Sequence, residues 1–183
     1  RDGDLVAIPV EFDVYGEAYN PRVTQALGIT EIPTTWREFF HLLAQLSHSD
    51  LDDYFVFAPW DTDFKETTLY QFLGAALFEM QQLEDTRGFL NAPEMRATLE
   101  EFEQIDFDAF LQGWEDGNDY TKDVLFFCPE ELNCYNYGWN RGMYPGDMPT
   151  FAAMPLSVQP GQPGFLDASM CVAIINPHTR HPQ

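Results

Sequence analysis

Apolar and polar residues alternate with a period of two over residues 5–20, which predicts a β-strand of the core. Successive side chains of a strand point to opposite faces. The apolar face would be made by Val10, Phe12 and Val14. The other face would carry two carboxylates and a phenol, those of Glu11, Asp13 and Tyr15. The strand is therefore expected to pack on one side and to offer polar groups on the other.

Helical spacing replaces this alternation further along the chain. A helix is predicted over residues 36–46, with Thr34 or Thr35 as its N-cap and Glu38 in its first turn. Its core-facing residues would be Phe39, Leu42, Leu43 and Leu46. A second amphipathic helix is predicted over residues 67–80. Its inward residues would be Leu69, Phe72, Leu73, Ala76 and Leu77.

The remaining elements complete a mixed pattern. A third helix is predicted through residue 103, with Asn91 as its cap and Pro93 in its first turn, and residues 107–114 extend the helical layer. Short strands are predicted at residues 54–58, 124–127, 151–156 and 167–178. This order predicts the α/β class, with a central mixed sheet flanked by helices. The length of 183 residues fits a single domain over residues 1–183.

The net charge of the chain limits the kinds of partner that it is expected to bind. The sequence has 9 Lys and Arg against 30 Asp and Glu, a net charge of −21. Such a chain repels phosphate backbones and anionic head groups, so neither nucleic acid nor a membrane surface is an expected partner. With 45% hydrophobic and 15% aromatic residues, it is also too rich in core material for a disordered acidic tail.

Cysteine and histidine give no support to a metal site or a cofactor. The three cysteines and four histidines show no CxxC or HxxxH spacing. Cys128 and Cys134 could pair, or could be small buried groups. The acidic stretches at residues 47–53 and 116–120 read as solvated turns, with calcium binding as the alternative. No apolar run reaches the roughly 18 residues of a membrane span.

Several segments together resemble a known family. Residues 8–20 have the form IP…YN, a short segment leads to Gly28, and residues 33–40 have the form P-x-TW-x-EF. Residues 89–94 and 167–178 are similar to two further family segments. The chain thereby resembles the extracellular solute-binding proteins of ABC transporters, in the group that includes the maltose-binding protein. The resemblance implies the second lobe of a type II periplasmic-binding fold, with the export signal and first lobe preceding Arg1 and more chain following Gln183.

The resemblance also implies a function. Two lobes would close on a solute, most simply a sugar or oligosaccharide, and the closed form would present it to an ABC permease. The protein would be an extracellular monomer, lipid-anchored or periplasmic, and not an enzyme. Asp13 occupies the place of a sugar-bonding carboxylate in the maltose-binding protein, and Glu11 and Tyr15 share its strand face. An ionised carboxylate holds sugar hydroxyls more strongly than a neutral acceptor does.

Two further groups of residues are expected at the solute site. The first follows the strand at residues 54–58 and comprises Trp60, Asp61, Glu66, Tyr70 and Gln71. The second comprises Tyr137, Trp139, Asp167 and Ser169. Aromatic faces stack on the C–H surface of sugars while neighbouring polar groups bond the hydroxyls. The alternative for Tyr137 and Trp139 is that their rings close the core or are covered by the missing first lobe.

Two other functions are weighed against solute capture. Glu11 and Asp13 would have Cα atoms roughly 7 Å apart along a strand, a separation that a glycoside hydrolase pair could use. No second hydrolase feature accompanies them, and no G-x-S-x-G motif is present. The strong negative charge also fits an acidic extracellular module that binds other proteins.

Overall fold

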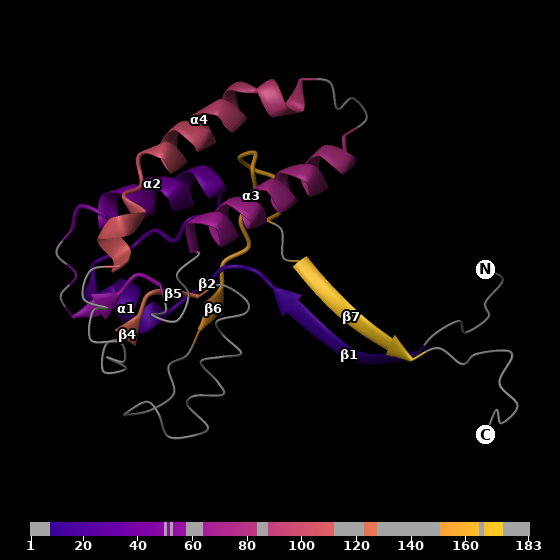
Figure 1. Cartoon of the computed structure of the whole chain (residues 1–183), viewed down its shortest axis with the longest axis horizontal. Helices are drawn as coiled ribbons and strands as arrows, with labels where there is room; N and C mark the ends of the chain where they lie inside the picture. The colour runs from indigo at the N-terminus through magenta and orange to yellow at the C-terminus, as the bar shows by residue number, and fades with distance from the viewer. Residues whose placement is uncertain are drawn as a thin grey trace, which may run out of the picture.

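The computed structural model describes residues 8–49, 51, 53–57, 64–83, 88–111, 123–127, 151–164 and 167–173. Within these ranges it contains helices and short strands, so the α/β class is confirmed. The helices α2, α3 and α4 lie together on one side of the short strands, and a two-stranded ribbon extends away from this body (Figure 1).

The ribbon consists of β1 (Ile8–Tyr15) and β7 (Asp167–Ala173). The two strands are antiparallel, with a register that runs from Ile8 opposite Ala173 to Tyr15 opposite Asp167 and an irregularity between Pro9 and Glu11. The strand predicted over residues 5–20 is thus divided: β1 ends at Tyr15, and β2 (Ala18–Tyr19) belongs to another sheet. Gly16 follows β1 directly, and glycine has a low preference for strand interiors.

The described residues of the body form two small sheets. In the first, β2 lies between β5 (Phe126–Phe127) and β6 (Ala152–Ala153) and is antiparallel to both. In the second, β3 (Tyr54–Phe55) is parallel to β4 (Asp123–Val124).

Leu125 joins these two sheets. Its N–H donates to the carbonyl of Phe55 at 2.8 Å, and its carbonyl accepts from Asn20 N–H at 2.9 Å. The expected single central sheet is therefore found only in part. Each of the strands β2 to β6 is two residues long. These strands form short ladders that are linked by individual hydrogen bonds.

The helices begin where local sequence provides their caps. Asn20 caps α1 (Pro21–Ala26) by accepting from the N–H groups of Arg22 and Val23. Thr35 caps α2 (Trp36–Leu46) and forms a reciprocal capping box with Glu38, so the predicted start and end of this helix are confirmed. Two short 3₁₀ helices, η1 (Phe89–Asn91) and η2 (Phe107–Leu111), flank α4 (Pro93–Glu103).

One cap was predicted wrongly. The N-cap of α4 is Ala92, which makes no side-chain hydrogen bond, and not Asn91. Asn91 ends the preceding 3₁₀ turn and so lies one position too early to cap the helix. Pro93 does occupy the first turn, where its missing N–H removes no helical hydrogen bond.

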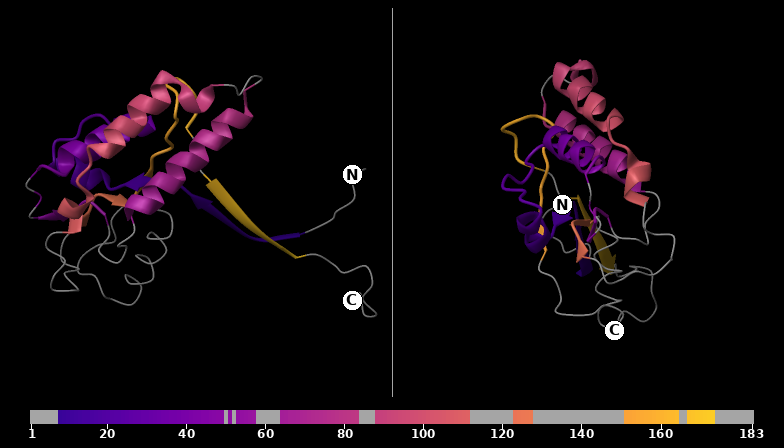
Figure 2. Two further views of the ribbon diagram at one scale, coloured as in Figure 1. Left: turned by 45° about the horizontal axis from the view of Figure 1, so that its top comes forward. Right: turned by 90° about the vertical axis from the view of Figure 1, so that its left-hand side faces the viewer.

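The core beneath the helices is largely aromatic. Phe39 and Phe126 meet edge to face with ring centroids 5.0 Å apart, and Phe40 meets Phe72 at 5.5 Å and Phe102 at 5.1 Å. Such pairs stabilise a core beyond the area that they bury. They join α2 to α3, to α4 and to β5, so the three helices and the short strands share one core (Figure 2). The predicted burial of Phe39, Leu43 and Leu46 is confirmed, and Leu42 is half-buried.

The inward face of α3 (Phe64–Gln81) differs from the prediction. Phe72 and Ala76 are buried as expected and Leu69 is half-buried, but Leu73 is 38% exposed and Leu77 is 49% exposed. The buried residues are Phe64, Thr68, Phe72, Ala75, Ala76 and Glu79. Glu79 is held there because its carboxylate accepts the N–H groups of Val158 and Gln159. Apolar residues lie on most sides of this helix, so the spacing alone does not select one face.

Candidate functional site

The end of the ribbon that adjoins the body brings together residues from two of the three expected groups. Asp13 of β1 lies opposite Ser169 of β7, and Tyr15 lies opposite Asp167. Glu11 lies opposite Cys171 in the same ladder. Glu11, Asp13 and Tyr15 occupy alternate positions of the strand, as the sequence pattern requires. This polar end of the ribbon is the candidate solute site.

Of the remaining expected group, the structure describes only Glu66, Tyr70 and Gln71, which lie on α3 (Phe64–Gln81). Because α3 begins at Phe64, three residues before the predicted start, Glu66 lies in its first turn, where the helix dipole favours a carboxylate. Glu66 is exposed, and Tyr70 is 71% exposed. Gln71 is half-buried, and its Oε1 atom has no hydrogen-bond partner among the described residues. Trp60, Asp61, Tyr137 and Trp139 lie outside the described residues, as do Cys128 and Cys134.

Glu17 is a candidate that the sequence analysis missed. It lies between β1 and β2, is 3% exposed, and has no hydrogen-bond partner for either carboxyl oxygen in the described part of the chain. Its backbone carbonyl accepts from Met154 N–H at 2.8 Å, which fixes it beside β6. Burial raises the pKa of Glu17 to about 8. The sequence pattern could have indicated this residue, because Glu17 stands at the next alternate position after Glu11, Asp13 and Tyr15.

A neutral Glu17 has a specific chemical capability. A protonated carboxyl can donate one hydrogen bond and accept another, whereas a carboxylate only accepts. Glu17 follows the polar end of the ribbon directly along the chain, so a donor of this kind lies next to the candidate site. Leaving a buried polar group without a partner costs free energy, so such a group at a ribbon end points to a polar contact made in function.

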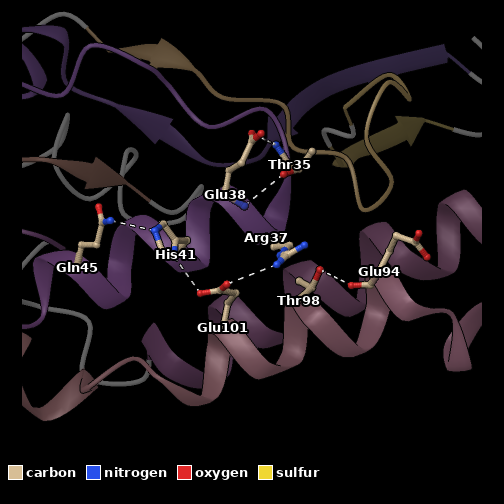
Figure 3. A network of polar contacts seen from close by, with 8 residues as sticks. All are labelled: Thr35, Arg37, Glu38, His41, Gln45, Glu94, Thr98 and Glu101. Carbon is tan, nitrogen blue, oxygen red and sulfur yellow. Dashed lines mark hydrogen bonds and ion pairs between the residues drawn. The ribbon is translucent and has the colours of Figure 1, made fainter.

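A second polar region lies on α2 and α4. His41 Nδ1 is 3.0 Å from Glu101 Oε2, and His41 Nε2 is 2.9 Å from Gln45 Nε2. Arg37 approaches the other oxygen of Glu101 at 3.8 Å (Figure 3). These side chains form one wall of a groove of about 780 Å³ that runs between α2, α4 and the segments at residues 31–35 and 158–160.

Glu38 stands at the same groove but is committed to the capping box. Its Oε2 accepts the N–H of Thr34 at 2.9 Å and that of Thr35 at 3.1 Å. These hydrogen bonds, led by the backbone of Thr34, lower the pKa of Glu38. Its carboxylate is thus occupied by the protein itself.

The described residues contain neither a candidate metal site nor a candidate membrane-spanning helix. Among those residues no three His, Cys, Asp or Glu side chains are grouped so that they could hold a metal ion. No helix in the same ranges combines the length and the apolar character that a bilayer span requires.

No family model matches the chain, and no curated protein sequence matches it significantly. The resemblance to extracellular solute-binding proteins therefore stays a prediction made from short segments of the sequence.

Proposed function

We propose that this chain is one lobe of a two-lobed extracellular protein that captures a carbohydrate for an ABC importer. The observation that carries the proposal is the ribbon. The chain enters the body through β1 and leaves it through β7, and the two strands are paired side by side over their whole length. A paired double connection of this kind lets two bodies open and close about a hinge while their relative direction is kept.

The proposed site lies at the hinge side of the lobe. Asp13 would accept hydrogen bonds from sugar hydroxyls, and Ser169 opposite it would supply a hydroxyl that both donates and accepts. Tyr70, whose side chain is 71% exposed, is free of the core and offers an aromatic face. A neutral Glu17 would add a donor beside these acceptors. The finer fold, the second lobe of a type II periplasmic-binding protein, belongs to the same proposal and is supported by the mixed strands under three helices.

The partners follow from the proposed mechanism. A ligand closes two lobes only when it contacts both of them, because only such contacts favour the closed state. One lobe by itself therefore binds weakly. The closed monomer would be recognised by the permease, outside the cell or in the periplasm, with or without a lipid anchor. The glycoside hydrolase alternative on Glu11 and Asp13 stays a prediction.

A panel of saccharides tests the proposal. The full-length protein that contains this chain is screened by thermal shift and then by calorimetry against mono- and oligosaccharides. At least one sugar is expected to raise its melting temperature, and the residues 1–183 alone are expected to show no comparable rise. The variant Asp13→Asn should weaken binding about tenfold or more, because a charged acceptor is lost.

The matched control is Asp108→Asn, which makes the same change on an exposed side chain of η2. It should leave binding unchanged. The absence of a response to any sugar in the full-length protein would reject carbohydrate capture. Turnover of a chromogenic glycoside that is lost in Asp13→Asn would replace it with hydrolysis.

A further inference from the structure

The groove between α2 and α4 has an apolar lining that none of the described helices or strands fills. Its volume of about 780 Å³ lies within the roughly 300 to 1,000 Å³ of common ligand sites. Apolar atoms come from both sides of α2, through Ile32, Pro33, Leu42, Val158 and Pro160. An occupant must therefore bring apolar groups with it.

Carboxylates outnumber cations around this apolar lining. Arg37 and His41 are the basic side chains among the lining residues. The acidic ones are Glu31, Glu38, Glu94 and Glu101. Four carboxylates face no more than two cationic side chains, so the groove has a net negative charge.

The charges of the groove are not equivalent. Glu101 is engaged by Arg37 and His41, and Glu38 is engaged by the backbone of Thr34 and Thr35. Glu31 and Glu94, by contrast, are exposed, and their carboxylates make no hydrogen bond or ion pair within the described residues; the Thr98 hydroxyl donates to the backbone carbonyl of Glu94, at 2.8 Å.

The two unpaired carboxylates come from different elements. Glu94 stands in the first turn of α4 (Figure 3). Glu31 stands in the segment that precedes α2. An occupant that met both of them would therefore contact two elements of the fold.

The walls of the groove are held in place before any partner arrives. The capping box fixes the segment that carries Glu38, and the contacts of Glu101 tie α4 to α2. Ser157 further ties the 158–160 side to the start of α2, because its carbonyl accepts from Trp36 N–H at 2.9 Å. A preformed groove costs little ordering entropy on binding.

We propose that this groove binds an extended, basic segment of a partner protein, in which two Lys or Arg side chains flank apolar residues. The basic groups would pair with Glu31 and Glu94, and the apolar residues would cover Ile32, Leu42 and Pro160. Charge complementarity carries the choice of occupant: the chain has a net charge of −21, and the unpaired charges of the groove are both negative. A small cation alone would leave the apolar lining exposed. The inference does not depend on the proposed capture of a solute.

Synthetic peptides test the proposal. The probes are fluorescein-labelled hexapeptides with blocked ends, in which two Lys or Arg residues are separated by one, two or three of the residues Leu, Val and Pro. Binding to the protein is measured by fluorescence anisotropy at low and at physiological ionic strength. At least one spacing should bind, and the salt should weaken it, because exposed charges are screened. The same peptide with Glu in place of Lys and Arg should not bind.

Matched variants locate the binding. The double variant Glu31→Gln with Glu94→Gln should weaken binding about three- to tenfold, in line with two exposed ion pairs. The control is Glu100→Gln with Glu103→Gln, which removes the same charge from exposed positions of α4 that do not line the groove. It should change binding less than twofold. Circular dichroism should show the same melting temperature for both double variants.

Four outcomes would overturn the proposal. One is equal weakening in both double variants, which would indicate attraction by net charge alone. Another is equal binding of the acidic peptide. A third is full competition by spermidine at the concentration of the peptide, which would make this a polyamine site. The last is the absence of binding for every spacing at low ionic strength.

Discussion

Asp13 lies directly opposite Ser169 in the antiparallel ladder of β1 and β7, although the two residues stand near opposite ends of the chain. The ladder thus brings together two residues that lie far apart in the sequence. It also sets where the chain enters and leaves the body, since both strands meet the body at the end that carries Tyr15 and Asp167. The solute site proposed for this lobe would lie at this end of the ladder.

The first prediction concerns Glu17 and pH. Its pKa is raised from 4.5 to about 8, so the folded chain holds this proton more tightly than the unfolded chain does. Its contribution to the free energy of unfolding is therefore greatest below pH 4.5. The contribution falls by about 1.4 kcal/mol per pH unit as the pH rises to about 8, and then levels off. Glu17→Gln removes the titrating group and should remove this fall. The free energy of unfolding of the variant should therefore rise relative to that of the wild type as the pH increases from 4.5 to about 8.

Urea unfolding at a series of pH values measures this difference. The control is Glu103→Gln, which makes the same substitution at an exposed carboxyl on α4. If the two variants behaved alike, Glu17 would not be a neutral buried acid in the folded protein.

The second prediction concerns the capping box of α2. Thr35→Ala removes the oxygen that accepts from Glu38 N–H at 3.2 Å, and should cost about 1 kcal/mol of stability. Glu38→Gln weakens the other half of the capping box, in which the Glu38 carboxylate accepts from the N–H of Thr35. Because the lowered pKa of Glu38 favours its ionised form, its contribution is present above the unfolded-state pKa and is lost as the pH falls through the folded-state value.

A double-mutant cycle checks this prediction by urea unfolding at pH 7. The two substitutions should be less than additive, because each already disturbs the box. Thr35→Ser keeps the accepting oxygen and should restore most of the loss. Full additivity would mean that the two halves of the box act independently.

Local sequence was sufficient to predict α2 because three signals coincide there. Thr35 starts the helix, Glu38 completes the box, and the apolar residues Phe39, Leu43 and Leu46 lie on one face. The class of the fold was likewise predictable from the alternation of strands and helices. Residues whose neighbours in sequence are also their neighbours in space are the ones that a pattern can specify.

Features that depend on distant segments could not be predicted. Nothing in the local pattern pairs Asp13 with Ser169, because a ladder between chain ends is chosen by the whole fold. Strands of two residues are too short for a period to be measured. The groove was missed for the same reason, since its lining comes from three separate segments of the chain, residues 31–45, 94–101 and 158–160.

The third prediction tests which face of α3 is buried. Phe72 is fully buried among aromatic rings, so Phe72→Ala should cost about 3 to 5 kcal/mol. The adjacent residue provides the control: Leu73 is 38% exposed, so Leu73→Ala should cost less than about 1 kcal/mol. Denaturant unfolding of both variants measures the difference. Equal losses would instead support the face that the sequence pattern predicts.

The fourth prediction compares two glycines. A Cβ atom on Gly164 would overlap the carbonyl of Pro155 and approach Leu156 N to 2.9 Å, and these are backbone atoms that cannot turn away. Gly164→Ala should therefore force the 155–164 loop apart and cost about 1 to 3 kcal/mol. Gly74 lies within α3 with no atom in contact distance of such a Cβ, and alanine is the better helix former. Gly74→Ala should accordingly add roughly 1 kcal/mol.

Thermal unfolding of the two alanine variants checks these opposite signs under one condition. The same loop carries Val158 and Pro160, which line the groove between α2 and α4. Gly164→Ala should therefore also weaken peptide binding there, whereas Gly74→Ala should leave it unchanged. If Gly164→Ala destabilised the protein and left peptide binding intact, the 158–160 segment would not contribute to the groove.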